Sequence, residues 1–535
     1  MASGWERECS LLRAFSEDLD AGPTLPDATS EQLSRHARAV DDLQNLLGLV
    51  AGLPPRDRPP AAEWDDILGP LWRRLFEKGD DIVRYVLADL WRGVLLEAGE
   101  TERYIRSCTA VAASARNASR FGEALACCRD ARRAAEGRPS AALGNLLNTE
   151  GTVHVLLKDY ESAEVSFREA LSRAEAMPEE ELLRHSGLGK EDYRAQEFLN
   201  ILECRLLRAL AHPGEERGRW VDSAREMFSL FERAPPNAAF ERTLEVDRAE
   251  LAIAEGRLAE ARRLLELQME DSSIRGPYRC SFQPMICRLL SLTASLEGDW
   301  RGAYRWVRSA LRMGVNHNFP AEDQFVLEQA VAVLRALHEN RDTEFSPALV
   351  DDLARLIEDK DWYTGKSHCR GVSRACVRLG RELNGHNGWN LDLDALEMAG
   401  RLHDIGKLRV PWSLLNKIAP ITPRERSILQ DHSSHGGDLL RKTGLPGLAA
   451  VVEQHHEALD GSGYPRGIPP CPAAAVLAVC DVYEAFVTPN RRYKEAKPAA
   501  LALAEIVGSS GTKYHPEVVK AIVRIAGRDP ENFPG

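Results

Sequence analysis

A helical spacing of apolar residues, repeated in similar blocks from about residue 65 to 340, most constrains the fold of this 535-residue chain. Within this stretch the apolar residues follow the i, i+3, i+4 pattern of amphipathic helices, and strand-like alternation is rare. The clearest block is NTEGTVHVLLKDYESAEVSFREAL, in which Gly151, Tyr160, Ala163 and Phe167 carry the pattern. Similar blocks begin at residues 118, 249 and 291. We therefore predict an all-α fold that begins with stacked helix pairs.

These blocks resemble tetratricopeptide repeats, in which small residues let two helices approach closely and a glycine ends one of them. The spacing is irregular, since Phe121 and Tyr160 are 39 residues apart and Leu258 and Trp300 are 42 apart. The 98 residues between Tyr160 and Leu258 have room for a further pair near GRWVDSAREMF. The resemblance implies that the array binds one or more protein partners. A plain helical bundle is the alternative.

Polar and Pro-rich segments divide the chain into three predicted parts. Residues 1–64 contain DAGPTLPDATSE and GLPPRDRPP, which indicate N-terminal helices joined by Pro-rich linkers. The segment HENRDTEF (338–345) is polar and separates the repeats, residues 65–340, from a second helical region, residues 346–530.

The charge and the apolar content exclude several classes of protein. The chain has 69 basic and 81 acidic side chains, and its net charge is −12, whereas residues 351–535 hold 24 basic and 23 acidic ones. Because the acidity belongs to the N-terminal two-thirds, we expect no binding of duplex nucleic acid there. No stretch approaches about eighteen uncharged apolar residues, so we expect no membrane insertion.

The start of the chain and its cysteines favour a cytoplasmic location. The first residues, MASGWERECSLL, lack the basic and apolar pattern of a secretory signal. The 11 cysteines are scattered without a CxxC pair, which is typical of thiols in a reducing compartment.

Histidines gather in the C-terminal third, which holds eight of the 14. Five of them and two aspartates lie at successive stations with roughly 20 to 35 residues between them, and each station is on or beside a separate predicted helix. Imidazole together with carboxylate favours Zn, Fe or Mn over Ca, and seven ligands exceed what one ion needs. Two ions bridged by one carboxylate would use all seven, and paired ions suit the displacement at a phosphodiester. The seven residues are His368, His403, Asp404, His432, His455, His456 and Asp481.

The motifs around these residues are, in combination, specific enough to indicate a protein family. They are DWYT (361–364), HDIGK (403–407), H-x3-G (His432, Gly436), HHExxDGSGYPxG (455–467), DVYEA (481–485), RRYK (491–494) and GTKYHPEVV (511–519). Together they resemble the HD-GYP subfamily of HD phosphohydrolases over roughly residues 350–525. The resemblance implies an HD-domain helical bundle that hydrolyses cyclic di-GMP, a bacterial second messenger, to linear pGpG or GMP.

The resemblance further implies a role for individual residues. The seven residues above would bind two divalent metal ions, with Fe or Mn expected and with Asp404 bridging them. Asp404 and Lys407 would be catalytic. Lys407, Arg491 and Lys494 would contact the phosphates of a cyclic dinucleotide, and Tyr464 of the GYP loop would shape the substrate site. A homodimer is compatible with the sequence.

Several departures from the family pattern leave alternatives open. Thr364 stands where members with a third ion carry Glu, so two ions are expected. One extra residue precedes His368, which leaves Ser367 as an alternative at that ligand position. The loop RGIPPCP (466–472) is short, and Ala475 replaces a usual Arg. The alternative functions are therefore a catalytically weak HD-GYP module that binds nucleotide or protein, and an HD hydrolase of another cyclic nucleotide.

Overall fold

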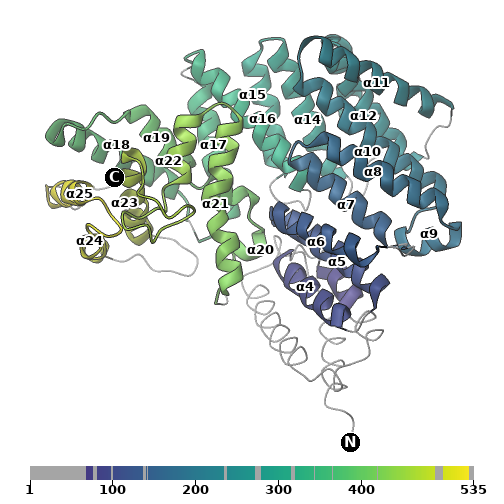
Figure 1. The fold of residues 1–535 in the computed structure, drawn as a ribbon. Helices are drawn as coiled ribbons and strands as arrows, with labels where there is room; N and C mark the ends of the chain where they lie inside the picture. The colour runs from purple at the N-terminus through teal and green to yellow at the C-terminus, as the bar shows by residue number, and fades with distance from the viewer. Residues whose placement is uncertain are drawn as a thin grey trace, which may run out of the picture. The chain divides into compact units, whose positions relative to one another are not determined.

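The computed structural model describes residues 68–75, 81–97, 100–136, 140, 142–233, 238–270, 279–314, 320–342, 344–363, 365–417, 420–487 and 498–528. In these ranges the regular structure is helical, apart from an isolated bridge between Ser510 and Tyr514, so the predicted all-α fold is confirmed (Figure 1). None of the helices in these ranges is both long and apolar enough to cross a bilayer. The predicted N-terminal region, residues 1–64, lies outside the described residues.

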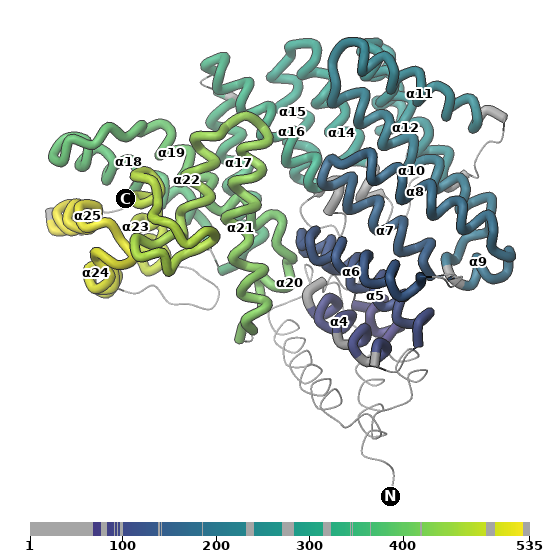
Figure 2. The backbone as a smooth tube through the Cα atoms, in the orientation of Figure 1, coloured from purple at the N-terminus to yellow at the C-terminus, as the bar shows by residue number. Residues whose placement is uncertain are grey.

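The chain divides into two compact units. The first unit comprises residues 1–297 with 317–321, and the second comprises residues 298–316 and 322–535. Figure 2 traces the helices of the first unit in purple to teal. They are α4 (Asp81–Glu97), α5 (Thr101–Asn117), α6 (Phe121–Ala134), α7 (Leu143–Leu156), α8 (Tyr160–Ala176), α9 (Glu179–Ser186), α10 (Lys190–Ala211), α11 (Gly214–Arg233), α12 (Ala238–Ala254), α13 (Leu258–Glu270) and α14 (Arg279–Leu296).

Consecutive helices of the first unit pack as pairs, as the repeated blocks predict. In the pair α7 and α8, a Cβ atom at Gly151 would overlap the buried ring of Phe167, so glycine permits the close approach of the two helices. After α12 the chain turns at Gly256, whose φ of 78° lies in the left-handed region that glycine adopts without strain. The glycines of the repeats therefore let paired helices approach closely and let the chain turn where a helix ends.

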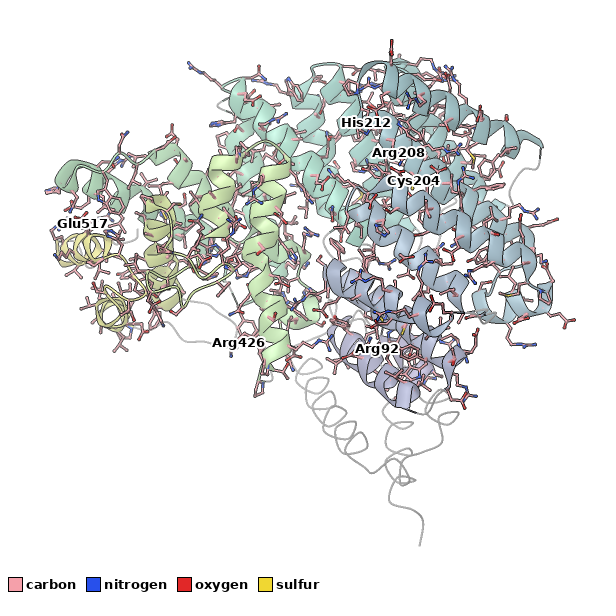
Figure 3. All side chains as sticks on the ribbon, viewed as in Figure 1. Arg92, Cys204, Arg208, His212, Arg426 and Glu517 are labelled. Carbon is pink, nitrogen blue, oxygen red and sulfur yellow. The ribbon has the colours of Figure 1, made fainter. Side chains whose placement is uncertain are left out.

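The long interval in the repeat pattern contains the further pair that the sequence predicts, α10 and α11. Cys204, Arg208 and His212 follow one another along α10 and just after it (Figure 3). The Cys204 side chain is buried, and the Arg208 guanidinium lies 4.1 Å from the ring centre of Trp220 on α11. A cation over an aromatic face thus joins this degenerate pair.

The second unit contains the histidine-rich region. Its elements are α15 (Trp300–Gly314), α16 (Pro320–Glu339), α17 (Phe345–Lys360), α18 (His368–Asn387), α19 (Leu393–Leu402), the 3₁₀ helix η3 (Ile405–Arg409), α20 (Trp412–Leu415), α21 (Pro423–Lys442), α22 (Pro446–Glu453), α23 (Pro472–Val487), α24 (Ala499–Gly508) and α25 (Pro516–Arg528).

The helix α15 belongs to this second unit although its sequence continues the repeat pattern. It packs against α17, where the Tyr304 hydroxyl donates to Asp352 Oδ2 at 2.9 Å and Arg308 Nε lies 2.8 Å from the same oxygen. The division between the compact units follows residue 297, whereas the sequence pattern places a domain boundary at 338–345. The predicted domain ranges, 65–340 and 346–530, stay predictions.

The close contact at Gly151 predicts the effect of a single added methyl group. Gly151→Ala should lower the free energy of unfolding by about 1–3 kcal/mol, because the Phe167 ring must leave its position. Gly93→Ala on α4 is the matched control, since nothing lies within 4 Å of its added Cβ, and it should stabilise by about 0.5–1 kcal/mol. Urea unfolding of the whole chain, followed by circular dichroism, measures both. Equal midpoints for the two variants would contradict this account.

Glu197 on α10 is a buried carboxyl group of the first unit. Asn148 Nδ2 donates to its Oε1 at 2.7 Å, and Asn200 Nδ2 donates to its Oε2 at 3.2 Å. Burial raises the pKa of Glu197 to about 7, and these hydrogen bonds offset only part of that rise. The folded state therefore holds a proton that the unfolded chain releases between about pH 4.3 and 7.

Because the folded protein retains the Glu197 proton, we predict that its free energy of unfolding depends on pH. As the pH rises from about 4.3 through 7, the Glu197 carboxyl should lower the free energy of unfolding by about 3 kcal/mol, because the buried group resists ionisation. Glu197→Gln should remove that decrease while leaving the value near pH 4 almost unchanged. Thermal unfolding of both proteins across pH 4–8 tests this, with the exposed Glu161→Gln as control. A parallel pH dependence in the variant would show that Glu197 is not the responsible group.

Candidate metal centre

Five short segments of the second unit bring the predicted ligands together. His368 is the first residue of α18, and His403 and Asp404 form the turn between α19 and η3. His432 lies in the middle of α21, His455 and His456 lie in the turn that follows α22, and Asp481 lies within α23. His368, His403, Asp404, His432 and His455 are buried, and His456 and Asp481 are half-buried.

The ligand atoms form two groups. One consists of His432, His455 and His456, and the other of His368, His403 and Asp481. In each group one donor atom from every member lies within 4.8 Å of the others. Each group is thus small enough for one cation.

His368, and not Ser367, takes part in the second group. The Nε2 atom of His368 lies 3.1 Å from Asp481 Oδ1, and its side chain is buried. Ser367 is exposed and sits before the helix with a φ of 78°. Its backbone N–H donates to Glu358 Oε2 at 3.0 Å, which holds the turn in this register. The extra residue between Thr364 and His368 is therefore accommodated in the turn before α18.

The Asp404 carboxylate lies between the two groups. Its Oδ2 is 3.1 Å from His403 Nε2, and its Oδ1 is 3.5 Å from His432 Nε2. Burial raises the pKa of Asp404, but the charges of His403 and Lys407 hold it well below the usual range. An ionised carboxylate therefore offers one oxygen to each group.

Backbone carbonyl groups fix the orientation of three imidazole rings. The Nδ1 atoms of His403, His432 and His455 each lie close to the carbonyl oxygen three residues earlier in the chain, at 3.0, 2.6 and 2.5 Å. Because a carbonyl oxygen only accepts, each Nδ1 carries the proton and donates it. The Nε2 atoms of the neutral His432 and His455 rings are then left with lone pairs that face the centre.

These two lone pairs face each other. The Nε2 atoms of His432 and His455 are 3.4 Å apart. Burial lowers the pKa of His432 and lowers that of His455 to about 3, so both rings are neutral near pH 7 and no proton is shared. Burial, reinforced by the neighbouring imidazoles, also holds the pKa of His456 well below its usual value. Facing acceptors of this kind suit a bound cation.

His403 has a different environment from the three histidines of the first group. Burial lowers its pKa, but the charges of Asp404 and Asp481 raise it more, to about 9. Its Nε2 atom is buried and makes no hydrogen bond of good geometry, although Asp404 and Asp481 oxygens lie 3.1 and 3.6 Å away. This nitrogen therefore points at two carboxylates, as a metal ligand would.

Lys407 lies beside Asp404 and also contacts Asp361, a residue for which no role is predicted from the sequence. Its Nζ atom is 2.8 Å from Asp404 Oδ2 and 2.7 Å from Oδ2 of the buried Asp361. Burial lowers the pKa of Lys407, but these two carboxylates raise it above its usual value, so the ammonium stays charged. The only sequence signal for Asp361 was its place in the DWYT segment.

The GYP loop packs on the first group of ligands. The ring of Tyr464 lies 4.8 Å from that of His456, between centres, and the Tyr464 N–H donates to the His456 carbonyl at 3.1 Å. A Cβ atom at Gly463 would overlap the backbone at Ala458, so the loop can approach the histidines only with glycine there. Tyr464 thus lies against a candidate ligand.

Glu457 anchors this loop, and sequence reasoning missed it as a functional residue. The buried Glu457 carboxylate accepts from the N–H of Arg466 at 2.7 Å and from the N–H of Ile468 at 3.1 Å. The Arg466 side chain in turn pairs with Glu453 at 2.9 Å. The carboxylates of Glu457 and Glu453 therefore hold the loop in place. The motif HHExxDGSGYPxG contains Glu457 but does not by itself indicate this role.

Three residues named from the sequence lie outside the described residues. They are Arg491 and Lys494, the predicted phosphate contacts, and Thr364. His515 packs on the ring of Trp389, whose Nε1 donates to Glu517 Oε2 at 2.7 Å. His515 therefore serves packing at the start of α25.

The region that contains the candidate ligands also matches a known protein family. Residues 351–518 match the model of the family described as HD domain. The C-terminal part of this chain is an HD domain. The resemblance seen in the HD-centred motifs is thereby confirmed for this region.

Curated relatives carry similar HD regions. "Cyclic di-GMP phosphodiesterase" of Thermotoga maritima is 32% identical over 228 residues, which are 41% of this chain and 61% of that protein. "Cyclic di-GMP phosphodiesterase response regulator RpfG" of Xanthomonas campestris is 33% identical over 183 residues, 32% of this chain and 46% of that protein. "3'3'-cGAMP-specific phosphodiesterase 2" of Vibrio cholerae is 27% identical over 230 residues, 41% of this chain and 43% of that protein. The similarity thus spans about half the length of these relatives.

A glycine on η3 allows the two halves of the centre to meet. A Cβ atom at Gly406 would overlap the carbonyl oxygen of His432 and would lie 2.6 Å from the backbone nitrogen of Gly436, so η3 packs directly on the α21 backbone. Asp404 and Lys407 flank Gly406 in the chain. Their place beside His432 therefore depends on the lack of a side chain at 406.

This contact predicts that Gly406→Ala separates Asp404 from His432. The variant should lose at least about 1–3 kcal/mol of unfolding free energy and should retain less divalent metal than the unaltered protein. Gly447→Ala on α22 is the control, since nothing lies within 4 Å of its added Cβ. Urea unfolding and elemental analysis after gel filtration measure both quantities. Full metal retention by Gly406→Ala at unchanged stability would refute the packing argument.

Proposed function

We propose that this protein is a metal-dependent phosphodiesterase that hydrolyses cyclic di-GMP to linear pGpG or GMP. The observation that carries the proposal is the pair of facing Nε2 atoms on His432 and His455, with the Asp404 carboxylate between them and the second ligand group. Several relatives of the HD region are named cyclic di-GMP phosphodiesterases.

The donor set fits two divalent ions. His432, His455 and His456 would hold one, His368, His403 and Asp481 would hold the other, and Asp404 would contribute an oxygen to each. Nitrogen and carboxylate donors of this kind suit Fe or Mn. A bound metal pair supplies positive charge that stabilises the oxygens of a phosphodiester undergoing displacement.

Side chains beside the ligand groups would contact the substrate and limit the shape of its site. Lys407 keeps its ammonium charged at neutral pH and lies beside Asp404, where it can contact a non-bridging phosphate oxygen. Tyr464, seated on His456, limits the site on the side of the GYP loop. Each hydrolysed phosphodiester consumes one water and leaves a phosphomonoester and a hydroxyl. Arg491 and Lys494 are proposed as further phosphate contacts on the resemblance alone.

A different cyclic dinucleotide is the second candidate substrate. The short loop at 466–472 and Ala475 concern the shape of the substrate site, and one relative is named as specific for 3'3'-cGAMP. Turnover of cyclic di-GMP, 3'3'-cGAMP and linear pGpG by the Mn²⁺-loaded protein distinguishes these candidates. Binding of cyclic di-GMP without any turnover would instead favour a nucleotide-binding module.

We further propose that the helix pairs of the first unit bind a protein partner, since stacked pairs present a long continuous surface. A cytoplasmic location and a homodimer stay predictions. Gel filtration with light scattering of the whole chain determines the oligomeric state.

Removal of the shared histidine and aspartate tests the catalytic proposal. His403→Ala combined with Asp404→Ala should abolish metal retention and reduce cyclic di-GMP turnover by about 10³-fold or more, because both groups lose a ligand. Asp438→Asn, an exposed aspartate on the same helix as His432, is the control and should retain both properties. Product analysis by chromatography and elemental analysis provide the two readouts. Unchanged turnover in the double variant would sink the mechanism.

A further inference from the structure

Lys407 and the candidate cation compete for the same oxygen of Asp404. The Nζ atom of Lys407 lies 2.8 Å from Asp404 Oδ2, and this oxygen also lies 3.1 Å from His403 Nε2 in the second ligand group. An ammonium ion bound to a ligand oxygen opposes a divalent cation there, because both are positive and both take the same lone pairs. The affinity of the centre for metal therefore depends on how strongly Lys407 is bound by Asp404 and how strongly by other groups.

Asp361 is the second carboxylate that holds this lysine. Its Oδ2 lies 2.7 Å from Lys407 Nζ, and its other oxygen accepts from the N–H of Tyr363 at 2.9 Å. Asp361 itself is buried, with 3% of its surface exposed. A carboxylate fixed in this way cannot swing toward the metal ligands, so it competes with Asp404 for the ammonium of Lys407.

The segment that carries Asp361 is tied to its surroundings on both sides. Asn416 Nδ2 donates to the carbonyl of Lys360 at 2.9 Å, and the N–H of Trp362 donates to Asn416 Oδ1 at 2.9 Å. The Lys360 ammonium donates to the carbonyl of Leu408, the residue after Lys407, at 2.6 Å. These contacts fix the distance between Asp361 and η3, which carries Lys407.

We propose that Asp361 is a positioning residue that shares Lys407 with Asp404 and retains the ammonium when a divalent cation binds Asp404, so that Lys407 stays beside the centre and can contact a substrate phosphate. This inference rests on the proposed function for the substrate, but its effect on metal affinity stands apart from catalysis. It gives the DWYT segment a chemical role that is exerted through Lys407.

The experiment measures Mn²⁺ binding to the full chain after chelation of bound metal, by titration calorimetry. Asp361→Asn keeps the acceptor for the Tyr363 N–H but removes the charge, and it should weaken Mn²⁺ binding about tenfold or more as Lys407 moves onto Asp404. Asp361→Asn with Lys407→Met should restore the affinity of the unaltered protein or exceed it, because no ammonium remains to compete. The exposed Asp359→Asn, two residues away, is the matched control.

The outcomes separate positioning from a merely structural role. If the double variant binds Mn²⁺ as weakly as Asp361→Asn, then Asp361 does not act through Lys407 and the proposal is overturned. Unaltered affinity in Asp361→Asn, or no Mn²⁺ binding by the unaltered protein, overturns it as well. Should Asp361→Asn fail to fold, Lys407→Met alone provides the test, since it must bind Mn²⁺ at least as tightly as the unaltered protein.

Cyclic di-GMP hydrolysis at saturating Mn²⁺ adds a kinetic readout. Asp361→Asn should lower kcat while changing KM less, because the lysine then engages Asp404 in place of the substrate. If no variant, including the unaltered protein, hydrolyses the dinucleotide, the proposed function fails. The Mn²⁺ affinities would still decide the role of Asp361.

Discussion

The centre depends on the direct packing of η3 against the backbone of α21. Gly406 lies on the His432 carbonyl, and the two charged residues that flank it, Asp404 and Lys407, are thereby brought to the middle of the site. No side-chain packing could replace this contact, because a methylene group between the two elements would move Asp404 beyond reach of His432. The HDIGK motif is thus as much a steric requirement as a chemical one.

Main-chain hydrogen bonding then determines what the histidines can do. Three rings donate Nδ1–H to the carbonyl three residues earlier, His403 and His455 at helix ends and His432 in the middle of α21. The same local geometry orients all three rings and sets the tautomer of the two neutral ones, His432 and His455. Burial keeps the rings of the first group neutral, and the carboxylates of Asp404 and Asp481 supply negative charge that bound cations would need.

Much of this arrangement could be predicted from the sequence, because each station depends on local helical structure. The intervals between His368, His403, His432 and His455 match successive helices, and the structure brings all of them to one place. The helix pairs followed in the same way from small residues such as Gly151. Arg491 and Lys494 stay predictions.

The contacts that the sequence did not reveal are those whose meaning depends on distant partners. Asp361 looks like any helix-terminal aspartate until Lys407, 46 positions away, is found beside it. Glu457 gains its role only when the loop folds back so that its carboxylate meets two backbone N–H groups. The choice between Ser367 and His368 likewise required the turn that Glu358 holds.

The packing of α15 on α17 affects where this chain can be shortened. Its residues Tyr304 and Arg308 supply partners to Asp352 on α17, at the start of the region that matches the HD domain. A shortened protein cut at the HD boundary would strip that aspartate of both partners and uncover the α17 surface on which α15 packs. The compact unit that contains the HD-like region therefore begins before that region, with a helix whose sequence continues the repeat pattern.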